Sequence, residues 1–350
     1  MNRFLLISCN LLLLWWLLPK QPASKVPEIE KALPNLSDYG LFKGPLAAMQ
    51  PADGVLSYEL NAPLFSDYAE KARFIKLPAG QKMQYSPDEV FQFPVGTVIA
   101  KTFSYHADAR KPKSKHRLLE TRILVHTENG WQAWPYIWNE DQTDAALEIT
   151  GGILPIEWKD EQSKKRSLQY SVPNVNQCKG CHSFNKQIVP IGPSARQLNH
   201  QISSKSGKVV QLEHWRQQGL IEGLPAKAGD IPALTAWSDN GADINSRARA
   251  YLDANCGHCH RPEGPGSTSG LFLHYAENDL GHLGVMKAPV AAGRGAGNRS
   301  FNIVPGKPEA SILLYRMESS DPGVMMPELG RQMTHQEGIE LLKAWIRQLQ

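Results

Sequence analysis

Two short cysteine motifs carry the residues that could do chemistry in this chain. They read Cys178-Lys-Gly-Cys181-His182 and Cys256-Gly-His-Cys259-His260. In each motif the two thiols stand at positions i and i+3, which are neighbours on a helix surface, so both can form thioethers with one edge of a porphyrin. The histidine that follows can bind the iron from beneath the ring. This spacing is typical of covalent c-type haem attachment, and it predicts two covalently attached haem c groups with His182 and His260 as proximal ligands.

Two other kinds of site also use paired cysteines. A zinc site with four cysteines usually separates its pairs by roughly 15–20 residues, whereas residues 182–255 lie between the pairs here. A redox dithiol of the thioredoxin type lies near a βαβ pattern and needs no trailing histidine. A histidine follows both motifs in a chain with only 11 histidines among 350 residues, so haem attachment explains the pattern better than either alternative.

The second motif also has a predicted distal ligand. Met326 stands directly before Pro327, and a residue before proline is held extended, which suits a loop that presents a thioether to iron. Met325, Met286 and His274 are the alternatives for this position. We therefore predict that His260 and Met326 bind one iron from opposite sides.

The first motif has no methionine within its own unit, because none lies between Cys181 and Cys256. His200 and His214 are the candidates for the sixth position of its iron, although a histidine on an amphipathic helix is more often a surface residue. An open sixth position is the third alternative.

The chain begins like an exported protein. A start that is positively charged at Arg3 precedes an apolar run up to Leu18, which is typical of a secretory signal. The run is shorter than the ~20 residues that span a bilayer, so we predict a signal peptide over residues 1–24, with an uncleaved anchor as the alternative. Cys9 lies inside this run, which leaves every cysteine of the mature chain in the two motifs. Covalent haem attachment takes place outside the cytoplasm in bacteria, in agreement with a periplasmic location.

The net charge of +4 is mild for a chain of this length. The basic residues form no stripe with interleaved aromatic residues, so nothing indicates a nucleic-acid partner. Residues 107–117 are densely basic. They are either a solvated loop or a docking surface for an acidic partner, since charged patches accelerate encounter.

Residues 25–170 are predicted to form a β-rich domain. The predicted strands are residues 73–77, 96–105, 118–126 and 131–138. They are rich in β-branched and aromatic residues, and Asn129-Gly130 favours a hairpin turn between the last two. The aromatic residues of the final strand either form core contacts or line a ligand surface.

The remainder is predicted to be helical, with a first haem-binding unit over residues 171–230 and a second over residues 231–350. The second unit has a predicted helix that ends at Cys256 and a C-terminal helix over residues 334–349, which Thr334 and Glu337 would begin as a capping box. A terminal helix that crosses the motif helix resembles the class I cytochrome c core. The predicted fold class is therefore α+β and multidomain: a mainly-β N-terminal domain followed by an α-helical cytochrome c-like region that carries two haems.

Several motifs together resemble a family of bacterial periplasmic diheme c-type cytochromes with an N-terminal β domain. The resemblance rests on residues 64–69 (LFSDYA), 93–97 (FPVGT), 120–122 (ETR), 176–182 (NQCKGCH), 247–260 (RARAYLDANCGHCH) and 326–331 (MPELGR). It covers nearly the whole mature chain. The resemblance implies electron transfer, and a periplasmic quinoprotein dehydrogenase or another cytochrome as the redox partner protein.

From these observations we expect a periplasmic diheme c-type cytochrome that carries electrons between a donor and an acceptor, rather than an enzyme, with no membrane span left after signal cleavage. The alternative is a diheme peroxidase-like enzyme whose first haem keeps an open position. A haem-based sensor or scaffold is the remaining possibility.

Overall fold

The structure is a computed structural model that describes residues 30–204 and 207–350. The predicted signal peptide at residues 1–24 and Cys9 lie outside the described residues. None of the helices in the described ranges is long and apolar enough to cross a membrane.

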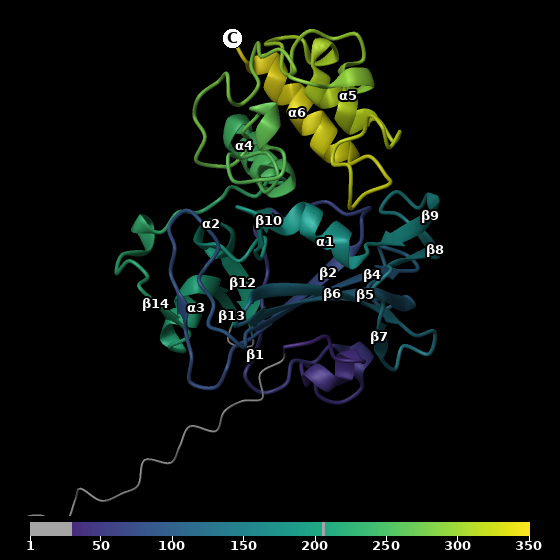
Figure 1. Cartoon of the computed structure of the whole chain (residues 1–350), viewed down its shortest axis with the longest axis vertical. Coiled ribbons are helices and arrows are strands. Elements are labelled where there is room, and N and C mark those ends of the chain that lie inside the picture. The colour runs from purple at the N-terminus through teal and green to yellow at the C-terminus, as the bar shows by residue number, and fades with distance from the viewer. Residues whose placement is uncertain (1–29, 205–206) are drawn as a thin grey trace, which may run out of the picture.

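A six-stranded antiparallel sheet organises the molecule (Figure 1). In order across the sheet, its strands are β1 (Val55–Ser57), β2 (Glu70–Lys76), β4 (Val98–His106), β5 (His116–Thr127), β6 (Gly130–Trp138) and β7 (Ala145–Leu147). Gly130 has φ +91 at the turn between β5 and β6, a conformation that glycine adopts without strain. The four predicted strands and the Asn-Gly hairpin are confirmed by β2, β4, β5 and β6.

Shorter elements surround this sheet in the part of the chain that the structure describes. The other strands are β3 (Met83–Gln84), β8 (Gly152–Lys159), β9 (Lys165–Val172), β10 (Ser183–Phe184), β11 (Gln187–Ile188), β12 (Gln201–Ser204), β13 (Gly207–Val210) and β14 (Ile221–Glu222). The α-helices are α1 (Val175–His182), α2 (Ala195–Leu198), α3 (Gln211–Gln217), α4 (Ile244–Leu252), α5 (Ile312–Glu318) and α6 (Gln336–Gln348).

The two faces of the sheet belong to different cores because side chains alternate along each strand. One face packs with the N-terminal segment that contains Leu36 and Tyr39, and Ile123 and Tyr136 are fully buried there. The other face contributes Ile75 and Ile99 to a second core. Figure 1 shows α1 beside that second face, between the sheet and the helices α4, α5 and α6.

The predicted fold class is wrong for residues 171–350. This part is not an α-helical cytochrome c-like region, because strands β10 to β14 alternate with short helices and long loops connect the rest. Its first part has no helical core of its own: Cys178, Leu198 and Trp215 pack into the same core as Ile75 and Ile99 of the sheet. The parallel pairing of β14 with β3 ties it to the N-terminal part as well. The molecule is mainly β around one large antiparallel sheet.

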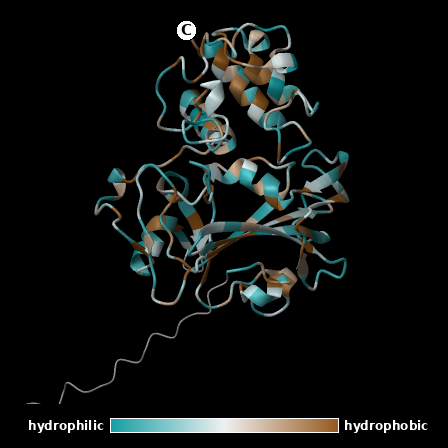
Figure 2. Cartoon of the chain, viewed as in Figure 1, coloured by the Kyte–Doolittle hydropathy of each residue, from teal (hydrophilic) through white to brown (hydrophobic). Residues whose placement is uncertain are grey.

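The C-terminal part is held by the packing of α4, α5 and α6. Their apolar residues form one cluster, in which Leu252, Leu342 and Ile346 are fully buried. Figure 2 shows hydrophobic colour concentrated on these helices and on the strands of the sheet. Gly338 allows the close approach, since a Cβ there would stand 2.3 Å from the Tyr251 ring. The predicted contact between the C-terminal helix and the motif helix is confirmed.

The predicted capping box at the start of α6 is wrong. His335 is the N-cap residue, and its side chain caps no backbone N–H group. Glu337 instead accepts a hydrogen bond from the Tyr68 hydroxyl at 2.9 Å, so a contact across the molecule replaces the local one.

Candidate haem-binding site

Helix α1 positions the first motif. Asn174 caps it through a reciprocal pair of hydrogen bonds with Gln177, at 2.8 and 2.9 Å, which satisfies backbone donors at the helix start. Cys178 is buried in the core that contains Ile75 and Ile99 of the sheet, whereas Cys181 is only half-buried. His182 ends the helix, so the motif is presented from one rigid helical turn.

The second motif follows α4, which continues into a π-helical turn over Asp253–Gly257. Asn255 accepts a hydrogen bond from the backbone N–H of Phe65 at 2.8 Å and donates to the Tyr251 carbonyl at 2.9 Å. Gly257 must be glycine, because a Cβ there would stand 2.9 Å from the Cα of His274. Such π turns are frequent at functional sites, and this one directs Cys256 inward.

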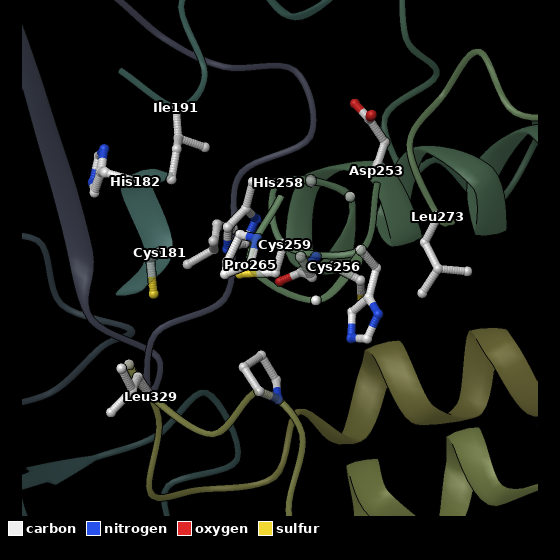
Figure 3. A pocket seen from close by; sticks show the side chains of 18 of the residues that line it. Cys181, His182, Ile191, Asp253, Cys256, His258, Cys259, Pro265, Leu273 and Leu329 are labelled. Atoms are coloured by element: carbon white, nitrogen blue, oxygen red, sulfur yellow. The ribbon is translucent and has the colours of Figure 1, made fainter. Parts of the chain in front are cut away.

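The two motifs face each other across one space. In Figure 3, Cys181 enters from α1 on one side, and Cys256, His258 and Cys259 enter from the opposite side. The Cys259 thiol donates a long hydrogen bond to the carbonyl oxygen of Gly180, at 4.0 Å. The neighbouring Cys259 lowers the pKa of Cys181, and Cys181 raises that of Cys259. Residues from distant parts of the sequence therefore form a single site.

A cavity of about 1040 Å³ lies between the motifs. This volume is just above the ~300–1,000 Å³ typical of small-molecule sites, so the cavity suits a large ligand. All six motif residues and Met326 line it: Cys178, Cys181, His182, Cys256, Cys259, His260 and Met326. Trp134 of β6 lines the cavity too, whereas Trp138 of the same strand is buried in the core. The aromatic residues of this strand therefore contribute both to a ligand surface and to the core.

Both motif histidines are held by their Nδ1 atoms. His182 Nδ1 lies 2.7 Å from the carbonyl oxygen of Val189 and donates to it. His260 Nδ1 lies 3.3 Å from the hydroxyl oxygen of Ser269, whose own proton is donated to Gly266. Burial lowers the pKa of both imidazoles to about 4. Each ring is thus neutral with a free Nε2 lone pair, the state that binds a metal.

A row of cations crosses the wall that the sheet contributes. Arg73, Lys101 and Arg122 are direct cross-strand neighbours on β2, β4 and β5, and all three line the cavity. Arg122 is paired with Glu120 at 2.6 Å, but Arg73 Nη2 is buried without a hydrogen-bond partner among the described residues. Burial, and then the charge of Arg73, push the pKa of Lys101 well below its usual value. The row would therefore be stabilised by an anionic group.

Arg331 holds the loop that carries Met326. Its guanidinium donates to the carbonyl oxygen of Met326 at 2.8 Å and to that of Ser319 at 3.0 Å. The Met326 N–H donates to the carbonyl oxygen of Arg316 at 3.0 Å. The backbone N–H and carbonyl group of Met326 are thus both held beside α5, and Met326 lines the cavity.

The alternative ligand candidates lie elsewhere. Met286 is 52% exposed, and neither it, Met325 nor His274 lines the cavity. His200 is also outside the cavity, with its ring bonded to the backbone of Gln201 and Glu59. His214, which bonds to the Gln218 side chain, does not line it either.

The geometry disfavours a four-cysteine zinc site. Within residues 30–204 and 207–350, no three ligand atoms from the two motifs lie within 4.8 Å of one another, whereas such a site needs a compact tetrahedron.

Sequence reasoning missed several side chains that line the cavity, among them His258, Met317 and Lys101. His258 stands inside the second motif, and only the position next to Cys259 could have pointed to it. Met317 is one of several apolar residues of α5, so the sequence does not single it out. Lys101 is one polar residue within a strand, and its place in the cationic row follows only from the pairing of β2, β4 and β5.

Comparisons with known protein families, with curated proteins and with solved structures found no match.

Proposed function

We propose that the chain is a diheme c-type cytochrome that transfers electrons between a donor and an acceptor in the periplasm. The observation that carries the proposal is that two complete Cys-x-x-Cys-His motifs line one cavity. Export by residues 1–24 would bring the chain to the compartment where such haems are attached. A periplasmic quinoprotein dehydrogenase or another cytochrome would be the redox partner.

The residues of the site suit this cofactor. Each motif offers two thiols for thioether bonds and one imidazole whose Nε2 is free, because its Nδ1 is hydrogen-bonded. A haem supplies a one-electron couple at its iron when bound. Arg73 and Lys101 would neutralise its carboxylate side chains, which fits the unpaired guanidinium nitrogen of Arg73. Apolar side chains on the remaining walls would limit the access of water.

Proximity favours electron transfer over two unrelated haem functions. Because the Cys259 thiol lies 4.0 Å from the Gly180 carbonyl oxygen of the first motif, two groups attached at the two motifs would stand close together. Electron tunnelling slows steeply with distance, so adjacent attachment points favour passage of an electron from one group to the other. Met326, held by Arg331, would raise the potential of the iron that His260 binds, which gives the two haems different potentials.

A peroxidase-like enzyme with an open first haem is the second candidate. It is favoured by the position of His200 and His214, both of which lie outside the cavity. No sixth ligand that the sequence offered for the first iron therefore reaches the site.

Optical and electron paramagnetic resonance spectra of the oxidised protein distinguish the two functions. An electron carrier is expected to show a low-spin ferric haem bound by His260 and Met326, and no peroxide turnover. A high-spin signal from one haem, together with rapid oxidation of an electron donor by hydrogen peroxide, would replace our proposal with the enzyme.

A further inference from the structure

Three potential metal ligands meet on the opposite side of the sheet from the haem cavity. They are Glu70 of β2, His106 of β4 and His116 of β5. His106 and His116 are direct cross-strand partners, and their rings stack with centroids 4.3 Å apart. Because side chains alternate along a strand, Glu70 and His106 point away from the face that carries Lys101.

Glu70 forms only long ion pairs with the two histidines. Glu70 Oε2 lies 3.5 Å from His106 Nε2 and 4.0 Å from His116 Nε2, and all three ligand atoms lie within 4.8 Å of one another. These distances exceed those of good hydrogen bonds. Ligands bound to one tetrahedral ion at about 2.0–2.1 Å stand roughly 3.3 Å apart, so a slight closure would place an ion among them.

Both imidazoles have an Nε2 atom that is free to bind a metal. His106 Nδ1 lies 3.3 Å from the Ser114 carbonyl oxygen and donates to it, which leaves Nε2 with its lone pair. His116 Nε2 is buried and has no hydrogen-bond partner in the described ranges. Burial and then the neighbouring His106 lower the pKa of His116, in keeping with the neutral form that a metal needs.

A small cavity of about 150 Å³ adjoins Glu70 and His106. Tyr105, Asp160 and Arg166 are also in its lining, and Asp160 pairs with Arg166 at 2.7 Å. The cavity has room for water or a small ligand at a fourth coordination position.

We propose that Glu70, His106 and His116 bind one divalent transition metal ion, of which zinc is the best fit. Two imidazoles and one carboxylate form a set that zinc uses in sites with an open fourth position. The site pins the ends of β2, β4 and β5 together. It is independent of the proposed haem function, because none of its three residues lines the haem cavity.

Calorimetric titration of the chelator-treated full chain, as purified, with zinc chloride tests this site. We expect one tight zinc per chain, and at least about a tenfold loss of affinity in both His116→Gln and Glu70→Gln. Glu70 is half-exposed at its side chain, 52%, so its variant keeps the fold even where His116→Gln does not. His282→Gln is the matched control, because His282 is an exposed histidine paired with the single carboxylate of Glu277, and it should bind zinc as the unaltered protein does. Failure of the unaltered chain to bind zinc, or equal affinity in the Glu70 variant, would overturn the proposal.

Discussion

At the scale of single residues, hydrogen bonds to Nδ1 leave His182 and His260 in the form that the proposed iron sites require. A free imidazole can turn and can carry its proton on either nitrogen. The Val189 carbonyl and the Ser269 hydroxyl remove this freedom, so that each ring presents Nε2 in one direction. Hydrogen-bond partners that orient a metal-binding histidine affect metal affinity almost as strongly as the ligand itself.

Met326→Ala should remove the thioether ligand of the haem attached to Cys256 and Cys259. A methionine ligand favours ferrous iron, so we expect a lower reduction potential for that haem. The weak red absorption band of a methionine-bound ferric haem should also disappear. The other haem should keep its potential, which a spectroelectrochemical titration resolves.

Met286→Ala is the matched control, since Met286 is exposed and outside the cavity. It should leave band and potential unchanged. If Met317→Ala abolishes the band while Met326→Ala preserves it, the ligand comes from α5 instead of the loop.

The motif residues could be predicted from the sequence because their chemistry depends on local spacing. Lys101 and Arg73 could not, because a register across β2 and β4 brings them together. Local patterns carry no information about which strand lies beside which. For the same reason Glu70 could not be identified from the sequence, because only strand pairing brings it close to His106 and His116.

At the scale of elements, the start of α6 connects the helices to the site. His335 stacks on the Phe65 ring at 4.2 Å, and its Nδ1 lies 3.0 Å from the Tyr251 hydroxyl. Burial lowers its pKa to about 4. The side chain is therefore neutral in the folded protein over a range in which an unfolded chain becomes protonated.

This difference predicts a loss of stability in acid. The contribution of His335 is complete above about pH 6.5 and is lost as the pH falls towards about 4, because only the unfolded chain takes up the proton; it amounts to at most about 3 kcal/mol. His335→Gln should make the free energy of unfolding less dependent on pH. Urea unfolding at about pH 7 and about pH 4 measures this, and identical pH dependence in both proteins would contradict it.

The elements themselves were predictable to different degrees. Strands β4 and β5 are rich in β-branched residues and α6 has an apolar face, so the sequence predicts all three elements correctly. The prediction of a helical first haem-binding unit was wrong, because the segments between α1 and α4 are too short to form a core of their own. They pack on the sheet instead, as Trp215 and Leu198 show, and such long-range packing overrides local propensity.

At the scale of the whole molecule, residues 64–69 connect the β part to the loops of the C-terminal part. The Asp67 carboxylate accepts hydrogen bonds from the backbone N–H groups of Gln332, at 2.8 Å, and Met333, at 2.7 Å. Phe65 donates its N–H to Asn255 before the second motif. The β domain thus positions both the motif and the loop that carries Met326.

Asp67→Ala should loosen this connection. Two backbone donors would lose their acceptor, at a cost of about 1–3 kcal/mol in the free energy of unfolding, and the band assigned to Met326 should weaken. Asp53→Ala is the control, because Asp53 is a fully exposed partner of Lys43. Chemical unfolding and the optical spectrum provide the two readouts, and equal effects of the two substitutions would argue against the connection.

The central claim is that this single cavity holds two covalently attached haems. Intact mass spectrometry of the chain, produced in a host that matures c-type cytochromes, measures their number directly. We predict two haems per chain, one after replacement of Cys178 and Cys181 by serine, and one after the same replacement of Cys256 and Cys259. A mass with one haem or none for the unaltered chain, while a known c-type cytochrome is fully loaded in the same host, would contradict the account.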